Sequence, residues 1–257
     1  MLELIDLSTL VILGLTAFVA GFIDAVAGGG GMLTVPALLS LGLPPHVALG
    51  TNKLAATFAS STAAFTYYKK RLFSPLFWQH AFWGTLIGAT AGTLLVDVLS
   101  TEWLEKAIPI VVLVAAIYTV WHPHPKGDNN QLPARCPKLP IKQWSQGLSL
   151  GFYDGVAGPG TGAFWAVSSM SLYRMNILLS SGLAKAMNFT SNITSLVAFA
   201  LLGHVNWALG LTMGVCLMLG AFIGAHSAIR FGSQFIRPIF VTAVVILAGK
   251  LAVDAWF

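Results

Sequence analysis

Two apolar stretches, 130 residues apart in the chain, each carry an acidic residue followed by a cluster of glycines. The first is Gly21-Phe-Ile-Asp-Ala-Val-Ala-Gly-Gly-Gly-Gly31, and the second is Gly151-Phe-Tyr-Asp-Gly-Val-Ala-Gly-Pro-Gly160. Glycine and proline are poor helix formers, so each stretch predicts a helix that breaks and then resumes. Because the same order of residue types occurs twice, we expect two related halves built around one site.

The composition excludes a water-soluble domain. Hydrophobic residues make up 56% of the chain, charged residues make up only 9%, and the mean hydropathy is +0.78. A soluble domain carries about 25% charged residues. The chain therefore has too little polar surface to face water, and it predicts an all-α, polytopic membrane protein.

Apolar segments follow one another in two sets, separated by a polar stretch rich in proline and basic residues. This stretch cannot cross a membrane and has no core of its own. We therefore divide the chain into a first transmembrane repeat (8–121), a linker (122–143) and a second transmembrane repeat (144–257). The expected segments are 8–27, 31–43, 46–68, 75–99 and 103–121, and then 144–158, 160–173, 177–202, 206–230 and 235–256.

The two halves match beyond the glycine clusters. Gly50-Thr-Asn-Lys53 corresponds to Gly182-Leu-Ala-Lys185 at a separation of 132 residues. Gly88-Ala-Thr-Ala-Gly92 corresponds to Gly220-Ala-Phe-Ile-Gly224 at the same separation. An internal repeat of this kind is typical of secondary transporters, whose substrate sites lie at the junction of the repeats.

Basic residues predict how the halves are oriented. Lys69-Lys70-Arg71 places the loop after the third segment in the cytoplasm, on the same side as the basic linker. The matching loop of the second half, residues 201–203, then lies outside. This pattern predicts two inverted repeats of about five helices each, about 8–10 spans in all, with both chain termini outside. The alternative is three full crossings and one re-entrant hairpin in each half.

The glycine clusters are candidate anion sites. Helices that resume after Gly28, Gly29, Gly30 and Gly31, and after Gly158, Gly160 and Thr161, present free backbone N–H groups and a positive dipole end. Irregular backbone inside a membrane occurs only where protein buries it or where it lines a wet cavity. Two such helix ends meeting near the midplane would bind an anion. The alternative is that the glycines only allow helices to pack closely.

Lys53 and Lys185 lie about 10 Å below the membrane surface by helix rise, where an unpaired charge is costly. Their helix faces are polar. Asn52 and Thr57 accompany Lys53, and Asn188 and Asn192 accompany Lys185. We therefore expect both lysines to face a substrate cavity. The alternative is that they reach back to the membrane surface.

Asp24 and Asp154 have three open roles. Each carboxylate could pair with a lysine, cap a helix N-terminus, or carry a coupling proton. The ridges Gly84-x-x-x-Gly88-x-x-x-Gly92 and Gly220-x-x-x-Gly224 allow close helix contact, either within one chain or in a homodimer.

Several function classes lack their motifs. The sequence has no Gly-x-x-x-x-Gly-Lys-Ser/Thr loop for ATP, no metal-ligand set and no nucleophile triad, so we expect neither an enzyme nor a cofactor. The few basic residues flank apolar segments, so we expect no nucleic acid. The expected partners are a small anionic substrate and the lipid bilayer.

The glycine-rich stretches, with Gly50-Thr-Asn-Lys-Leu54 and Ala184-Lys-Ala-Met-Asn-Phe-Thr-Ser-Asn192, resemble the motifs of the TauE/SafE family. These are the sulfite/sulfonate exporters also called TSUP, and the chain most resembles their YfcA-like branch of probable membrane transporters. The resemblance covers about residues 10–257. It implies a bacterial inner-membrane protein that exports a small sulfur-containing anion such as sulfite, thiosulfate or an organosulfonate.

These observations predict a secondary transporter that binds its anion between two inverted halves and works by alternating access. The membrane potential or a proton on Asp24 or Asp154 would drive it. An anion channel, or a cation-coupled importer of a small organic solute, would use the same residues differently. The halves differ at Leu183-Ala184 against Thr51-Asn52, so we expect a chemically asymmetric site.

Overall fold

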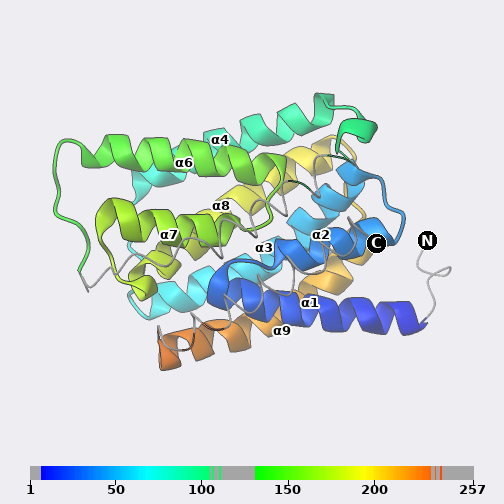
Figure 1. The fold of residues 1–257 in the computed structure, drawn as a ribbon, viewed down its shortest axis with the longest axis horizontal. Coiled ribbons are helices and arrows are strands. Elements are labelled where there is room, and N and C mark those ends of the chain that lie inside the picture. The colour runs from blue at the N-terminus through cyan, green and yellow to red at the C-terminus, as the bar shows by residue number, and fades with distance from the viewer. Residues whose placement is uncertain are drawn as a thin grey trace.

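A computed structural model describes residues 7–104, 106, 110, 131–232, 235 and 238. The long helices lie roughly along one axis of the molecule (Figure 1). In the first half they are α1 (Leu7–Ala27), α2 (Gly31–Ser40), α3 (Pro45–Lys69) and α4 (Gln79–Val98). In the second half they are α6 (Leu139–Val156), α7 (Thr161–Tyr173), α8 (Ile177–Leu201) and α9 (Trp207–Phe231).

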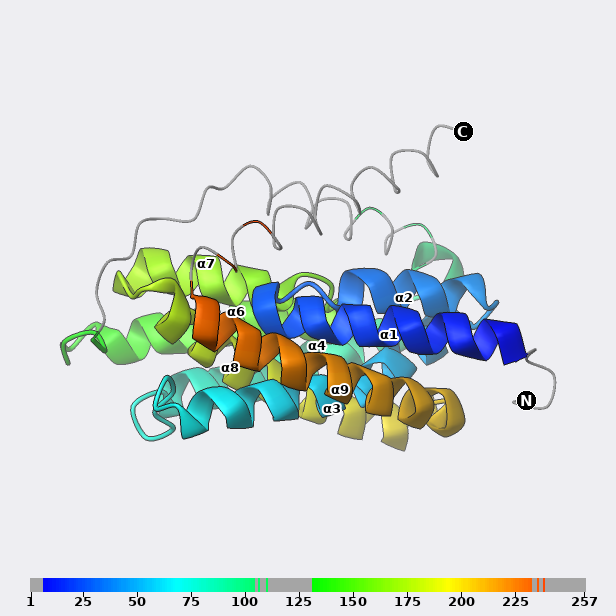
Figure 2. The same ribbon diagram turned by 90° about the horizontal axis from the view of Figure 1, so that it is seen from below.

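The two halves run in opposite directions. In Figure 1, α1 runs from right to left, whereas its counterpart α6 runs from left to right. Helix α1 packs along α9 (Figure 2), and the equivalent pair is α6 along α4. Helices α3 and α8 cross between these two pairs and contact each other. Exchanging the halves therefore converts each helix pair into another observed pair, as an inverted repeat requires.

Three of the described helices are long and apolar enough to span a membrane. They are Ser8–Ala27, Gln79–Val98 and Trp207–Phe231. At 25 residues each, α3 and α8 are also long enough, but they carry many polar residues. Those polar residues are mostly buried between the other helices, away from lipid. The prediction of an all-α polytopic membrane protein is confirmed.

Helix boundaries differ from the predicted ones at three places, one of which is α4, which begins at Gln79 rather than near 75. Helix α2 ends at Ser40 rather than near 43, and α6 begins at Leu139 rather than near 144. Pro140 lies in the first turn of α6, where its missing N–H removes no helical hydrogen bond, so the helix starts inside the proline-rich stretch. The predicted segments 103–121 and 235–256 lie almost wholly outside the described residues.

Glycine ridges join the two halves. A Cβ atom on Gly88 of α4 would lie 2.7 Å from the backbone nitrogen of Phe152 in α6. In the equivalent pair, a Cβ on Gly224 of α9 would lie 2.5 Å from the carbonyl oxygen of Phe22 in α1. Lipid offers no hydrophobic driving force between helices, so such close backbone contact is the main source of association. The structure thus uses these ridges for packing within one chain.

We expect Gly88→Leu to destabilise the protein by at least about 1–3 kcal/mol, because the new side chain must push the backbones of α4 and α6 apart. Ala91→Leu is the matched control, since Ala91 lies on the same helix and is exposed. Thermal unfolding of the two purified variants, followed by size-exclusion chromatography, would measure the difference. Equal stabilities would show that the ridge does not hold the halves together.

Candidate substrate site

Each half contains a broken helix, and both breaks begin with a glycine in the left-handed conformation. Helix α1 ends at Ala27 and α2 begins at Gly31, while α6 ends at Val156 and α7 begins at Thr161. The equivalent residues Gly28 and Gly158 have φ angles of 84° and 85°. This left-handed conformation favours glycine, because a Cβ atom would clash with the following carbonyl group.

The two breaks pack against each other. A Cβ atom on Gly28 would overlap the backbone of Gly162 and lie 2.5 Å from the nitrogen of Ala163. A Cβ on Gly31 would lie 3.4 Å from the Cα atom of Pro159. From this contact, α2 and α7 extend toward opposite ends of the molecule (Figure 1). The N-termini of both short helices therefore converge, as the glycine clusters predict.

Lys53 of α3 binds the acidic residue of the other half. Its Nζ donates hydrogen bonds to Oδ1 of Asp154 at 2.8 Å, to the carbonyl oxygen of Asp154 at 2.5 Å, and to Oδ1 of Asn192 at 3.3 Å. The Asp154 carboxylate also accepts hydrogen bonds from the hydroxyl groups of Thr161, at 3.1 Å, and Ser191. Both side chains of the ion pair are only 2% exposed. This ion pair is therefore well hydrogen-bonded and shielded from solvent.

Lys185 of α8 makes the reciprocal pair, but more loosely. Its Nζ donates to the carbonyl oxygen of Asp24 and lies 4.0 Å from the carboxylate oxygen Oδ2. Oδ1 of Asp24 accepts a hydrogen bond from the backbone N–H of Gly30 at 3.2 Å. The Asp24 side chain is 12% exposed, against 2% for Lys185. The ammonium group of Lys185 therefore has no hydrogen bond to a carboxylate among the described residues.

This geometry decides between some of the roles left open by the sequence. Lys53 and Lys185 are each 1% exposed, so neither reaches back to the membrane surface. Asp24 and Asp154 each pair with a lysine of the other half, and Asp24 also accepts from an N–H group at the start of α2. Each pair joins a lysine of one half to a carboxylate of the other, so the four charged residues lie where the two halves meet.

The remaining predicted residues surround these pairs with amide and hydroxyl groups. Oδ1 of Asn52 accepts a hydrogen bond from Thr34 at 2.5 Å. Nδ2 of Asn192 lies 3.4 Å from Oδ1 of Asn188. Thr57 is an exception, because its hydroxyl donates to the carbonyl of Lys53 in its own helix. Asn52, Asn188 and Asn192 are buried, whereas Gly29, Gly31 and Gly158 are half-buried.

The sequence places Ser191 among the polar neighbours of Lys185, but it does not single out two other contributors to this cluster, Thr34 and Tyr153. Thr34 bonds Asn52, Ser191 bonds the Asp154 carboxylate, and Tyr153 donates to the carbonyl oxygen of Pro159 at 2.6 Å. Thr34 sits one helical turn from Gly31, so a search for polar residues at that spacing would have found it. Tyr153 replaces Ile23 of the first half, and this difference was the available signal.

The cluster is rich in hydrogen-bond donors, and its described residues include no metal-ligand set. Two ammonium groups, amide groups and the N-termini of two helices are all hydrogen-bond donors. Among the described residues, no group of three His, Cys, Asp or Glu side chains could hold a metal ion. The two carboxylates now neutralise the lysines, so an arriving anion would have to displace one of them.

A polar contact closes one end of the molecule, where α8 meets α9. Nε2 of His204 lies 2.9 Å from Oδ1 of Asp97 at the end of α4. The ring of His46, at the start of α3, lies 5.2 Å from that of His204 and bonds the carbonyl oxygens of Val96 and Leu99 at 3.1 Å. This contact ties together the ends of α3, α4 and α8.

Comparison with known proteins finds one family and several relatives that match nearly the whole chain. The sulfite exporter TauE/SafE family matches residues 13–251. A probable membrane transporter protein of Haemophilus influenzae is 37% identical over 257 residues, which cover 98% of each chain. The probable membrane transporter protein YfcA of Escherichia coli K12 is 36% identical, covering 95% of this chain and 90% of its own. Protein ORF9 of Sinorhizobium, also a probable membrane transporter, is 35% identical, with 95% and 93% covered.

No solved structure matches the chain. The family match spans nearly the whole sequence and includes both glycine breaks and both lysines. Its members, like the relatives above, are described as membrane transporters and not as enzymes. With this coverage and identity, the chain belongs to the TauE/SafE family of membrane transporters.

Proposed function

We propose that this membrane transporter exports a small sulfur-containing anion, such as sulfite, thiosulfate or an organosulfonate, by alternating access. The proposed substrate class follows the family description. The observation that carries the proposal is the pair of crossed contacts, Lys53 with Asp154 and Lys185 with Asp24, where two helix N-termini converge. A substrate site at the junction of inverted repeats is the arrangement that transporters of this kind share.

The substrate would compete with the protein's own carboxylates. An oxyanion of sulfur presents several oxygens that accept hydrogen bonds from an ammonium group and from backbone N–H groups. Lys185 is the more available cation, because it lies 4.0 Å from the Asp24 carboxylate, whereas Lys53 lies 2.8 Å from that of Asp154. We infer that the anion binds Lys185 and the N-terminus of α2 first and displaces Asp24.

Alternating access would then move helix pairs as rigid units. The glycine ridges lock α1 to α9 and α4 to α6, so each unit contains one helix from each half. Between them, α3 and α8 carry the lysines. We infer that the two units rock about the α3–α8 crossing. In a cell that is negative inside, a membrane potential of 100 mV favours the export of an anion by about 2.3 kcal/mol per charge. Export therefore needs no second, coupled ion.

We further propose that the protein lies in the bacterial cytoplasmic membrane, with the linker in the cytoplasm and both termini outside. Its partners in this proposal are the small anion and the lipid bilayer. The glycine ridges are already occupied within the chain, so a homodimer would have to form through another surface.

Replacing Lys53 alone with methionine should cost about 3–5 kcal/mol of stability, because the Asp154 carboxylate is left buried without its partner. The double variant Lys53→Met with Asp154→Asn should recover most of this loss, since asparagine can still bond Thr161 and Ser191. Thermal unfolding of wild type, both singles and the double gives the coupling free energy. A coupling near zero would mean that the pair does not stabilise the fold.

The anion should stabilise the wild-type protein and not a variant that lacks the charge pairs. At one hundred times the dissociation constant, a ligand specific for the folded state adds about 2.7 kcal/mol. We would test sulfite, thiosulfate, sulfoacetate, taurine, sulfate and chloride on wild type and on Lys185→Gln with Asp24→Asn. Lys138→Gln, at an exposed position, is the control and should respond like wild type.

The same variants in proteoliposomes separate the function classes. A carrier shows saturating transport and counterflow of labelled anion, whereas a channel shows neither. If the double variant responds to every anion as wild type does, the charge pairs are not part of the anion-binding site. Uptake of a neutral solute that depends on a cation gradient would show that the protein is a cation-coupled importer and not an exporter.

The orientation can be read from the chain's own cysteines. Cys136 is exposed near the start of α6, while Cys216 is half-buried within α9. A membrane-impermeant maleimide should therefore leave Cys136 unmodified in intact spheroplasts and modify it in inverted vesicles. The control is Thr101→Cys with Cys136→Ser, which should give the opposite result because Thr101 is exposed beyond the other end of α4. Labelling of Cys136 from outside would reverse the proposed orientation.

A further inference from the structure

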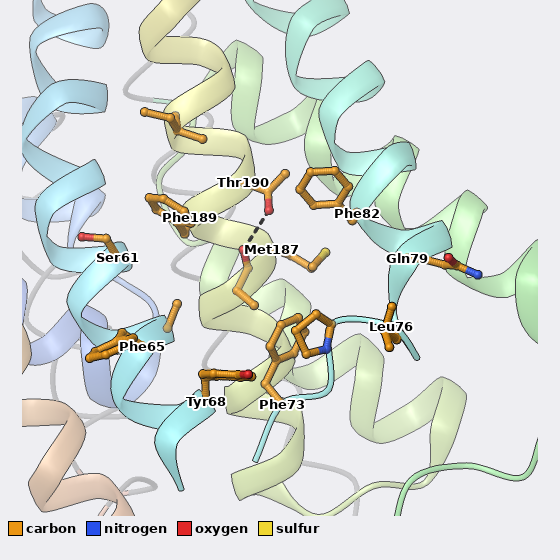
Figure 3. A pocket seen from close by; sticks show the side chains of 14 residues that line it. Ser61, Phe65, Tyr68, Phe73, Leu76, Gln79, Phe82, Met187, Phe189 and Thr190 are labelled. Carbon is orange, nitrogen blue, oxygen red and sulfur yellow. Dashed lines mark hydrogen bonds between the residues drawn. The ribbon is translucent and has the colours of Figure 1, made fainter. Parts of the chain in front are cut away.

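An open groove lies between α3 and α4, with α8 as its floor (Figure 3). Its volume is about 680 Å³, within the range of about 300–1,000 Å³ that is typical of ligand pockets. Its walls are largely aromatic and aliphatic, with Phe65 and Tyr68 from α3, Phe82 from α4, and Met187 from α8. Phe65 is 57% exposed and Tyr68 is 51% exposed. In a membrane-spanning chain these side chains face lipid. We call this feature the α3–α4 groove.

The second half fills the equivalent space. There, a Cβ atom on Gly210 of α9 would lie 2.5 Å from Leu54 of α3, and one on Gly214 would lie 2.8 Å from Phe58. Helix α9 therefore closes directly onto α3. The residues that correspond to these glycines, 132 positions earlier, are Trp78, directly before α4, and Phe82 within α4. Large side chains thus stand where the other half has glycine, so this part of α4 cannot approach α8 as closely as α9 approaches α3.

At the floor of the groove the size difference between the halves is reversed: here the groove side has the smaller residue. Phe58, which fills the space beside α9, corresponds to Thr190 of α8, a much smaller residue that lines the groove. Compared with the other half, the side chains beside α4 are larger and the side chain on α8 is smaller. The groove is therefore built by specific residues and is not a general consequence of the repeat.

The mouth of the groove carries positive charge. Lys69, Lys70 and Arg71 follow Tyr68 directly, and all three are exposed. Nζ of Lys69 lies 4.5 Å from the centre of the Phe65 ring, so this ammonium group stands at the wall of the groove. The corresponding residues of the second half are Leu201, Leu202 and Gly203, which have no charge. The groove and the basic cluster thus occur together at this end, whereas the corresponding described residues of the other half are closely packed and carry no charge.

We propose that the α3–α4 groove binds one anionic phospholipid of the surrounding bilayer. An acyl chain lies between α3 and α4, and the phosphate group contacts Lys69, Lys70 and Arg71. Between Ser61 and Tyr68 the groove follows α3 for about 10 Å, which takes it from the membrane surface well into one leaflet. Basic residues at the membrane surface attract anionic headgroups, and apolar walls suit hydrocarbon. The site is separate from the transported anion, because the proposed lysines, Lys53 and Lys185, are each 1% exposed and do not line the groove.

The direct test uses the wild-type protein in inverted membrane vesicles with a phosphatidylglycerol analogue that carries a diazirine on its acyl chain. Illumination should label residues 186–193 and 61–68, and unlabelled phosphatidylglycerol should compete better than phosphatidylcholine. Labelling spread evenly over lipid-facing residues of α9, such as Leu211 and Val215, would contradict a defined site. This test needs no variant and so does not depend on folding.

Two variants divide the site into its parts. Thr190→Phe restores the residue found in the other half and should abolish retention of phosphatidylglycerol in native mass spectrometry. Its control is Val197→Phe, which adds the same bulk at an exposed position of the same helix. Lys69→Gln with Lys70→Gln and Arg71→Asn should remove the preference for phosphatidylglycerol over phosphatidylcholine. Its control is Arg230→Gln, an exposed cation on α9.

Three results would overturn the proposal. Wild type could retain both lipids equally, or Thr190→Phe could retain phosphatidylglycerol as Val197→Phe does. In the third, the wild type is a dimer that Thr190→Phe converts to a monomer, which would assign the groove to a second copy of the chain. None of these results depends on which anion the protein transports.

Discussion

The crossed ion pairs impose the main constraint on this structure. A lysine deep in a membrane protein must be paired or hydrated, because its charge is poorly tolerated among apolar groups. Here the partner of each lysine comes from the other half: Asp154 for Lys53 and Asp24 for Lys185. Neither half can bury its own lysine alone. The two halves must therefore dock in one relative position, with both helix breaks at the contact, before the charges are compensated.

Close backbone packing makes this position possible. The carboxylates sit at the ends of α1 and α6, and each of these helices packs by glycine ridges against a helix of the other half. At the centre, Gly28 leaves room for the backbone of Gly162. A side chain at either place would separate the breaks and lengthen the lysine–carboxylate distances. Glycine thus contributes twice, by forming the turn and by admitting the neighbouring backbone.

The sequence predicts the inverted repeat, the breaks and the buried lysines because these depend on local residue types and on an internal comparison. It does not predict that Lys53 pairs with Asp154 rather than with Asp24, because that choice depends on how the two halves dock. For the same reason the sequence does not predict the hydrogen-bond partners of Thr34 and Ser191, which lie on other helices. The ridges at Gly88 and Gly224 are compatible with packing within one chain or in a homodimer. Only the packing of α4 on α6 and of α9 on α1 shows that they are used within the chain.

Departures from the repeat carry a further consequence. If the two halves were identical, the states open to either side of the membrane would have equal free energies, because exchanging the halves interconverts them. At one end, His46, His204 and Asp97 make a polar contact. The corresponding residues at the other end are Leu178, Leu72 and Ile229, which are all apolar. Opening the first end breaks the hydrogen bond between His204 and Asp97, whereas opening the second exposes apolar surface. We infer that this difference, together with the looser pairing of Lys185, sets which state is populated when no substrate is bound.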